Sequence, residues 1–517
     1  MELRKFTHRI GSFTSATLIS RILGYIRDAL VAAYFGGGFV TDAFYAAFRV
    51  PNLLRRFMGE GSMTAAFIPV FTDVATKKGE KEANQFLNAL MSGLLALLFL
   101  MVVLGVIFAP VVAKAVAWGF GDEKLKLTIE LIRLVFPFLI VISLAALLTA
   151  ILNSVGRFFV PALSPAGLSV GMIVFILLLS SKMASPIHGL AISVVVGGLI
   201  HFLVQIPSLY RAGFHLKLVT PFSHPQVRDF FILLLPTILG LCADQINAFV
   251  DQVCASFLRD GSVTALYNSN RIMQLPLALF GIAVSSVALP ALSKSASLEN
   301  KIEFKETLHF SLRMANYVLI PSTIGLLVLG YPIIQLLFEH GLFSAYYTKL
   351  TWKALWPYAL GLPAYSAVRI LATSFYAQKD TKTPVRIALW AMVLHVVGNL
   401  ILMWKYEITG LAISTAVAGW FQAICLFIII RRRIGPFGGR RLLTSFLSGS
   451  GIGLIMGLFC LGLDQYLLSS FSVYMRVPGV IGMGCVIYFS ISKIFKLEEF
   501  AHLLDAVKKK KLPVSSK

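Results

Sequence analysis

Stretches of roughly 20 predominantly apolar residues recur along the whole length of this 517-residue chain. A helix of that length crosses the hydrocarbon core of a bilayer and satisfies its own backbone hydrogen bonds there. The chain is 57% hydrophobic and only 14% charged, whereas a typical soluble domain is about half apolar and a quarter charged. The short alternating segments of a membrane β-barrel are absent from the sequence. We therefore predict an all-α polytopic membrane protein.

Hydropathy predicts about 14 transmembrane helices, of which the first, second, seventh and eighth are the most polar. The predicted spans are 10–34, 43–71, 84–112, 127–152, 161–180, 187–210, 229–258, 263–293, 307–331, 350–376, 383–404, 408–430, 442–467 and 473–495.

The positive charge of the chain is concentrated in every second connection between these spans. The net charge of +22 would also suit a nucleic-acid-binding protein, but cytoplasmic loops of membrane proteins are rich in Lys and Arg, so we predict no nucleic-acid partner. "TKKGEKE", "KSASLENKIEFKE" and "RRRIGPFGGRR" are rich in these residues, whereas "GGGFVT" and "RDGS" are poor. This asymmetry predicts that both termini are cytoplasmic.

Two halves of the sequence resemble one another. "GLAIS" occurs at 189–193 and again at 410–414, 221 positions later. At nearly the same shift "DAFYAAFRVPNL" aligns with "TALYNSNRIMQL", which places Arg49 over Arg271. Several matches near one offset indicate an internal repeat.

The repeat predicts a domain organisation and a mechanism. We expect an N-lobe of about six helices over 1–222, a similar C-lobe over 223–436, and two further helices with a basic tail over 437–517. An even number of spans per lobe inserts both lobes the same way up, as in transporters built from parallel repeats. Such proteins work by alternating access around a central cavity.

Ionisable residues at membrane depth are costly, and by default they indicate a substrate pathway or a binding site. On the four polar spans arginines outnumber carboxylates, and Asn270 and Gln274 lie beside Arg271. The cationic set is Arg21, Arg27, Arg49, Arg55, Arg56 and Arg271, and the acidic set is Asp28, Asp42, Glu60, Asp244 and Asp251.

Two explanations of this charge distribution stay open. The charges either pair with one another and only hold helices together, or form the wall of a binding cavity. A surplus of arginine favours an anionic ligand, and the planar guanidinium suits phosphate. Taken as a set, the arginines favour the binding cavity.

Three segments closely resemble the MurJ (MviN) lipid II flippases of the multidrug/oligosaccharidyl-lipid/polysaccharide exporter superfamily. They are "SRILGYIRDALVAAYFG", "TDAFYAAFRVPNLLRRFMGEGSMTAAFIPVF" and "GSVTALYNSNRIMQLPLALFGIAVSSVALPALSK". The resemblance implies two six-helix lobes plus two helices that guide a lipid tail. It also implies a multi-pass, non-enzymatic monomer of the bacterial cytoplasmic membrane, in contact with membrane lipids and with cell-wall synthesis machinery. The implied substrate is lipid II, undecaprenyl pyrophosphate bearing a disaccharide-pentapeptide.

The resemblance also implies roles for individual residues. Functionally important arginines of the family fall on Arg21, Arg27, Arg55 and Arg271, and an aspartate falls on Asp42. To these substrate-binding candidates we add Arg49, Asn270 and Gln274, and we assign gating or ion coupling to Asp28, Glu60 and Asp251. Some family members carry acidic residues where this chain has Asn270 and Gln274, which puts a salt-bridged gate in doubt.

The family further implies that a sodium ion or the membrane potential drives transport, without another cofactor. Some members have a sodium site with an aspartate on the seventh helix and polar ligands on the eleventh and twelfth. Asp251 fits the first position, and the eleventh helix offers only Asn399 and His395.

Four other functions compete with this interpretation. The chain could flip another polyprenyl-pyrophosphate-linked glycan. A cation-coupled exporter should have an acidic rather than a basic cavity. A membrane glycosyltransferase needs a catalytic carboxylate, often with a metal ion, and no acidic pair has the spacing for one. A scaffold without transport would not need an interior lined with arginine.

Overall fold

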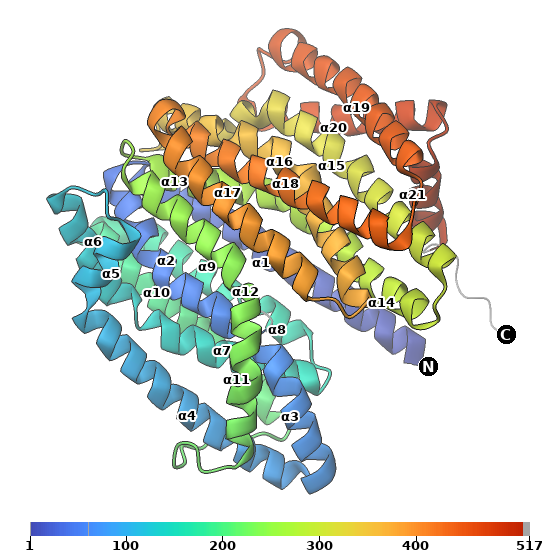
Figure 1. The fold of residues 1–517 in the computed structure, drawn as a ribbon. Coiled ribbons are helices and arrows are strands. Elements are labelled where there is room, and N and C mark those ends of the chain that lie inside the picture. Colours follow the sequence, from blue (N-terminus) through green and yellow to red (C-terminus); the bar gives the residue numbers. More distant parts are fainter. Residues whose placement is uncertain (1, 60–61, 510–517) are drawn as a thin grey trace. The chain divides into compact units, whose positions relative to one another are not determined.

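The structure is a computed structural model that describes residues 2–59 and 62–509. Throughout these residues the regular structure is helical (Figure 1). Glu60, one of the predicted gating residues, lies outside the described residues. The chain forms two compact units, Met1–Thr264 with His340–Ser344, and Ala265–Glu339 with Ala345–Lys517. They are called unit 1 and unit 2 below.

The described residues of unit 1 form twelve α-helices, one 3₁₀ turn and the first residues of α13. The helices are α1 (Glu2–Phe35), α2 (Phe39–Gly59), α3 (Ser62–Lys78), α4 (Glu80–Ile107), α5 (Ala109–Val116), α6 (Asp122–Val135), α7 (Phe138–Ser154), α8 (Phe159–Leu163), α9 (Ala166–Leu178), η1 (Ser180–Lys182), α10 (Pro186–Leu203), α11 (Ile206–Tyr210) and α12 (Gln226–Ser256).

Unit 2 contains the remaining helices and two π-helical segments, η2 and η3. They are α13 (Ser262–Pro276), η2 (Leu277–Ile282), α14 (Ala283–Ser297), α15 (Lys301–Phe338), α16 (Ala345–Ala377), α17 (Lys382–Tyr406), α18 (Ile408–Ile434), α19 (Gly439–Gly462), η3 (Leu463–Leu467), α20 (Val473–Ile494) and α21 (Glu498–Lys509).

Within the described residues, nine helices are long and apolar enough to cross a membrane, or ten if the bent pair α6 and α7 is one span. The predicted all-α membrane fold is confirmed, but the predicted count of fourteen spans is not. The long helices α1, α12 and α16 are not among these nine. They are long enough to cross, because a bilayer core needs about 20 helical residues.

Close backbone packing in unit 1 depends on glycines. The backbones of α9 and α10 lie so close together that a Cβ added at Gly171 would lie 2.6 Å from the Cα atom of Gly197. A Cβ at Gly167 would lie 2.7 Å from the backbone nitrogen of His201. Small residues four positions apart are the usual way in which membrane helices approach closely, because lipid offers no hydrophobic force between helices.

Hydrophobic cores hold the described residues of unit 2 together. The first joins α14, α15, α16 and α18 around Leu292, Leu308, Phe375 and Leu426. The second joins α15, α19 and α20, and there the hydroxyl of Tyr488 donates to the backbone carbonyl of Tyr317 at 2.6 Å. The helices α19, α20 and α21, orange-red to red in Figure 1, form the C-terminal part of this unit.

The helix α21 is attached to unit 2 through its first turn. Glu499, 3% exposed, accepts hydrogen bonds from Arg313 of α15 and Ser445 of α19, both at 2.7 Å. Arg313 also donates to Glu498 at 2.7 Å. Burial raises the pKa of the Glu499 carboxyl, but the hydrogen bonds from Arg313 and Ser445 outweigh it, so the pKa lies below its usual value.

The two units do not follow the predicted lobes, since α12 packs on α2 and α3 in unit 1. The lobes were predicted from an internal repeat in the sequence, whereas the two units are defined by which residues lie close together in space. The spatial division therefore does not show where one repeat ends and the next begins. The division at residues 222 and 436 therefore stays a prediction.

Candidate functional site: a buried carboxylate and the arginines

Asp42 lies in the first turn of α2 and is only 1% exposed. One carboxylate oxygen accepts hydrogen bonds from the backbone nitrogen and the hydroxyl of Thr264, at 2.8 and 2.7 Å. The other accepts from the backbone nitrogen of Gly261 at 2.7 Å and from the ammonium group of Lys124 at 2.8 Å. All of these residues belong to unit 1.

The contacts of Asp42 explain how a charge is tolerated in an apolar interior. The first N–H groups of a helix have no partner within the helix and carry partial positive charge, so an anion there is stabilised. Thr264 and Gly261 supply such groups at the start of α13. Asp42 therefore caps a helix that begins about 220 residues later in the chain.

Lys124 balances the charge of Asp42. Its side chain is 6% exposed and also bonds the carboxylate of Asp260 at 2.7 Å, which is 60% exposed. The ammonium group lies 4.2 Å from the ring centre of Phe120, a cation–π contact. We call Asp42, Lys124, Asp260 and Thr264 the carboxylate clamp, because together they join the starts of α2, α6 and α13.

Sequence reasoning found only part of this clamp. Asp42 was predicted from the family resemblance, as a substrate-binding residue. Lys124, Asp260 and Thr264 were not predicted, because a lysine in "GDEKLKL" and an aspartate in "RDGS" look like ordinary loop residues. In the structure the Asp42 carboxylate accepts hydrogen bonds from Thr264, Gly261 and Lys124.

The arginine and aspartate of α1 form a buried pair. Arg27 donates to the same oxygen of Asp28 through Nε at 2.9 Å and through Nη2 at 2.6 Å. Both residues are buried, whereas Arg21 is exposed. The sequence places Arg21 and Asp28 on one helix face and Arg27 off that face. The long arginine side chain nevertheless reaches its neighbour, so local charge pairing decides the contact.

The arginines of α2 are held by hydrogen bonds. Arg49, half-buried, donates to the backbone carbonyl of Ala248 on α12. Arg55, also half-buried, donates through Nε to the side-chain oxygen of Asn52 at 2.9 Å. Asp251, one turn after Ala248, is half-buried.

The polar residues of α13 lie in unit 2. Asn270, Arg271 and Gln274 are all half-buried. The side-chain amide of Gln274 donates to the side-chain oxygen of Asn270, one turn earlier. The two neutral side chains thus form a hydrogen bond with each other on one face of α13.

The residues predicted for a sodium site were tested by their donor atoms. In unit 2, the Nε2 atom of His395 lies 3.2 Å from the hydroxyl of Thr415 and 3.3 Å from the side-chain amide nitrogen of Asn399. Hard cations prefer carboxylate, carbonyl and water oxygens, and here an imidazole nitrogen lies at the centre of the cluster. The described residues contain no group of three or more His, Cys, Asp or Glu that could hold a metal ion. These contacts do not decide whether a sodium ion binds, so the sodium site stays a prediction.

Comparison with known proteins defines first a class and then a family. A solved multidrug resistance MATE family transporter of the MOP superfamily, in an inward-facing conformation, matches 80% of this chain and 94% of its own, with TM-score 0.68 and 14% identity. This likeness establishes the fold of that transporter superfamily.

The family follows from closer matches. The family model for the lipid II flippase MurJ matches residues 31–482. A probable lipid II flippase MurJ of Vibrio cholerae is 37% identical over 428 residues, 81% of each chain, and a lipid II flippase MurJ of Burkholderia cenocepacia is 32% identical over 423 residues. A solved lipid II flippase MurJ, inward closed, matches 93% of this chain and 98% of its own, with TM-score 0.79 and 30% identity. The chain belongs to the MurJ family of lipid II flippases.

Proposed function

We propose that this protein carries lipid II, the lipid-linked precursor of peptidoglycan, from the cytoplasmic to the outer leaflet of the bacterial inner membrane. The match of the MurJ family model over residues 31–482 carries this proposal. The protein acts as a transporter and not as an enzyme, and its transport supplies cell-wall synthesis. Both termini lie in the cytoplasm.

The chemistry of the substrate agrees with the arginines of the polar helices. A pyrophosphate presents several anionic oxygens, and charge-assisted hydrogen bonds from arginine are strong where water is excluded. Arg21, Arg27 and Arg55 come from unit 1 and Arg271 from unit 2. We assign all four to binding the pyrophosphate during transport, with Arg49, Asn270 and Gln274 in supporting positions. Asp28 partly neutralises the positive charge of Arg27 through the hydrogen bond between them.

The carboxylate clamp suits a gating role better than substrate binding. Its acceptors are already occupied by the start of α13 and by Lys124. Alternating access requires one end of the transporter to close while the other opens. We assign Asp42 to holding the end where α2, α6 and α13 begin, and its release to the opening of that end.

The test is replacement of each of the four arginines. Arg→Ala should abolish rescue of a flippase-depleted bacterium and the arrival of lipid II in the outer leaflet, while membrane abundance stays normal. Arg→Lys should recover only part of the transport, because lysine keeps the charge and loses the planar fork. Arg211→Ala is the matched control, since Arg211 lies exposed after α11. Full transport by the Arg271→Ala variant would overturn the assignment.

Arg27 needs a further variant because its removal takes away the guanidinium group that is bonded to the buried carboxylate of Asp28. The double variant Arg27→Ala with Asp28→Asn removes both charges. If Arg27 binds substrate, the double variant stays inactive although its membrane abundance is normal. Recovery of transport in the double variant would mean that Arg27 only neutralises Asp28.

A further inference from the structure

The segment that joins α11 to α12 is attached along α4 in regular steps. The backbone nitrogens of His215, Lys217 and Val219 donate to side chains of α4 at 3.3, 2.9 and 3.0 Å. The acceptors are one turn apart, at Asn84, Asn88 and Ser92. Two extended residues advance about 6.6 Å and four helical residues about 6 Å, so the two spacings agree. The segment is therefore a fixed strap and not a loose linker.

The strap ends in a strained phenylalanine. Phe222 has a φ angle of +60°, in the left-handed region that bulky side chains rarely adopt. Its ring lies against Gly93 of α4, where an added Cβ would come within 3.0 Å of the ring. It also contacts the ring of Phe231 at 6.0 Å between centres. Strain of this kind persists where the surroundings over-determine a conformation, and it concentrates at functional sites.

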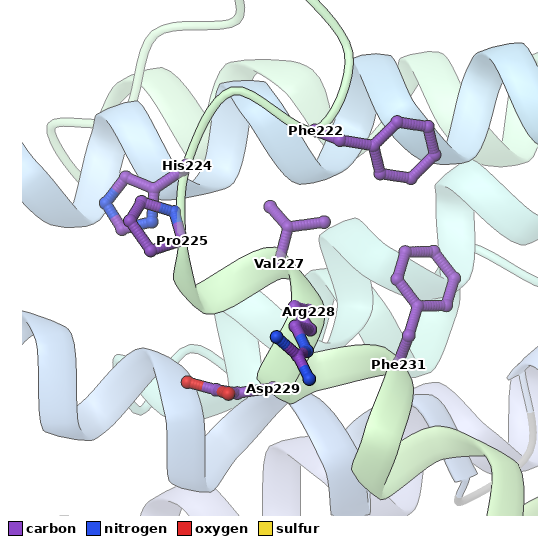
Figure 2. A pocket seen from close by; sticks show the side chains of 7 residues that line it. All are labelled: Phe222, His224, Pro225, Val227, Arg228, Asp229 and Phe231. Carbon is purple, nitrogen blue, oxygen red and sulfur yellow. The ribbon is translucent and has the colours of Figure 1, made fainter.

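Phe222 lines a pocket of about 510 Å³ at the start of α12 (Figure 2). Phe222 and Phe231 lie on one side of it, and Arg228 and Asp229 project from the first turn of α12 (Figure 2). Both charged residues are exposed. Throughout the described residues, neither side chain forms an ion pair or a hydrogen bond.

Exposed apolar side chains of α12 follow the charged residues of the pocket. The exposed side chains of Ile232 and Leu233, 57% and 43% accessible, follow Asp229 within about one turn of α12. Both follow Phe231, a lining residue of the pocket, directly in the sequence. A headgroup at Arg228 and Asp229 would therefore place its acyl chains along α12.

We propose that this pocket binds a phospholipid with a phosphoethanolamine headgroup. Arg228 would take the phosphate, for which guanidinium is well suited. Asp229 would accept hydrogen bonds from the primary ammonium group, and the two phenyl rings would contact the glycerol and the first acyl carbons. A purely anionic headgroup would instead meet the repulsive carboxylate of Asp229. This proposal does not depend on which lipid-linked substrate the protein transports.

The test uses the full purified chain in detergent, titrated separately with phosphatidylethanolamine, phosphatidylcholine and phosphatidylglycerol. Native mass spectrometry gives the dissociation constant of the tightest site. We expect phosphatidylethanolamine to bind about tenfold more tightly than the other two, because only it has both a phosphate and a hydrogen-bonding ammonium group. Arg228→Ala should weaken all three lipids. Asp229→Asn should weaken only phosphatidylethanolamine, and the control Lys217→Ala on the strap should change none.

Phe222→Gly separates binding from folding. Glycine relieves the strained backbone, so this variant should keep its thermal stability and still bind phosphatidylethanolamine several-fold less tightly. Equal affinity for the three lipids in the unchanged protein would overturn the proposal. Arg228→Ala and Asp229→Asn variants that bind phosphatidylethanolamine as tightly as the unchanged protein would also overturn it.

Discussion

Replacement of Lys124 by methionine tests the carboxylate clamp most directly. The distance of 2.8 Å between its ammonium nitrogen and the Asp42 carboxylate corresponds to an attraction of about 6 kcal/mol at an effective dielectric constant of 20. Loss of water around both charges offsets much of this. Removal of one partner of a buried pair costs about 3–5 kcal/mol, because the other charge stays buried. Asp42 keeps three other hydrogen bonds. We therefore expect Lys124→Met to lower the free energy of unfolding by about 3 kcal/mol, the lower end of that range.

A double-mutant cycle separates the pair from its surroundings. Lys124→Met with Asp42→Asn removes both charges, so it should be at least about 1 kcal/mol more stable than Lys124→Met alone. The recovery is partial, because one asparagine side-chain amide hydrogen would face the backbone N–H of Gly261. The free energy of unfolding can be measured by reversible denaturation in mixed SDS micelles.

The matched control is Lys77→Met, which breaks an ion pair of 2.6 Å with Asp73 that is 71% and 57% exposed. An exposed pair contributes about 0–1 kcal/mol, so this variant should be nearly as stable as the unchanged protein. If Lys124→Met lowers the free energy of unfolding no more than Lys77→Met does, the burial of the Lys124–Asp42 pair does not make it a strong contact.

Three other predictions follow from the topology, the coupling hypothesis and the C-terminal helix. In a cysteine-free background, a membrane-impermeant thiol reagent should label Gly121→Cys but not Gly439→Cys in intact cells; both glycines are exposed with open space for a side chain, and the reverse pattern would invert the topology. The sodium hypothesis predicts that Asp251→Asn lowers transport and removes its dependence on sodium; unchanged transport with unchanged dependence would end it. The pKa of Glu499 is depressed, so its bond to Arg313 stabilises α21 above the ordinary carboxyl pKa of about 4.3 and is lost as pH falls through the lowered value. The protection factors of the α21 amides, which correct for the pH dependence of intrinsic exchange, should therefore fall in strong acid and, in Glu499→Gln, already at neutral pH; equal protection of Glu499→Gln at pH 7 would contradict this.

The class of the protein was readable from its sequence because each relevant signal is local. Apolar windows of bilayer length indicate membrane helices without any knowledge of their packing. The surplus of arginine on polar spans and the motifs around Arg49 and Arg271 are also properties of short segments. These features were sufficient to predict an all-α transporter and the MurJ family.

The contacts of the charged residues depended on the tertiary structure. Asp42 meets Lys124 and Thr264, 82 and 222 positions away, and no periodicity in the sequence links such distant residues. Arg27 pairs with Asp28 although helix geometry favours Arg21. The strap along α4 depends on the match between an extended step and a helical turn, which exists only after both segments are packed side by side. Local composition therefore determined what these residues are, and long-range packing decided which charges are neutralised within the protein.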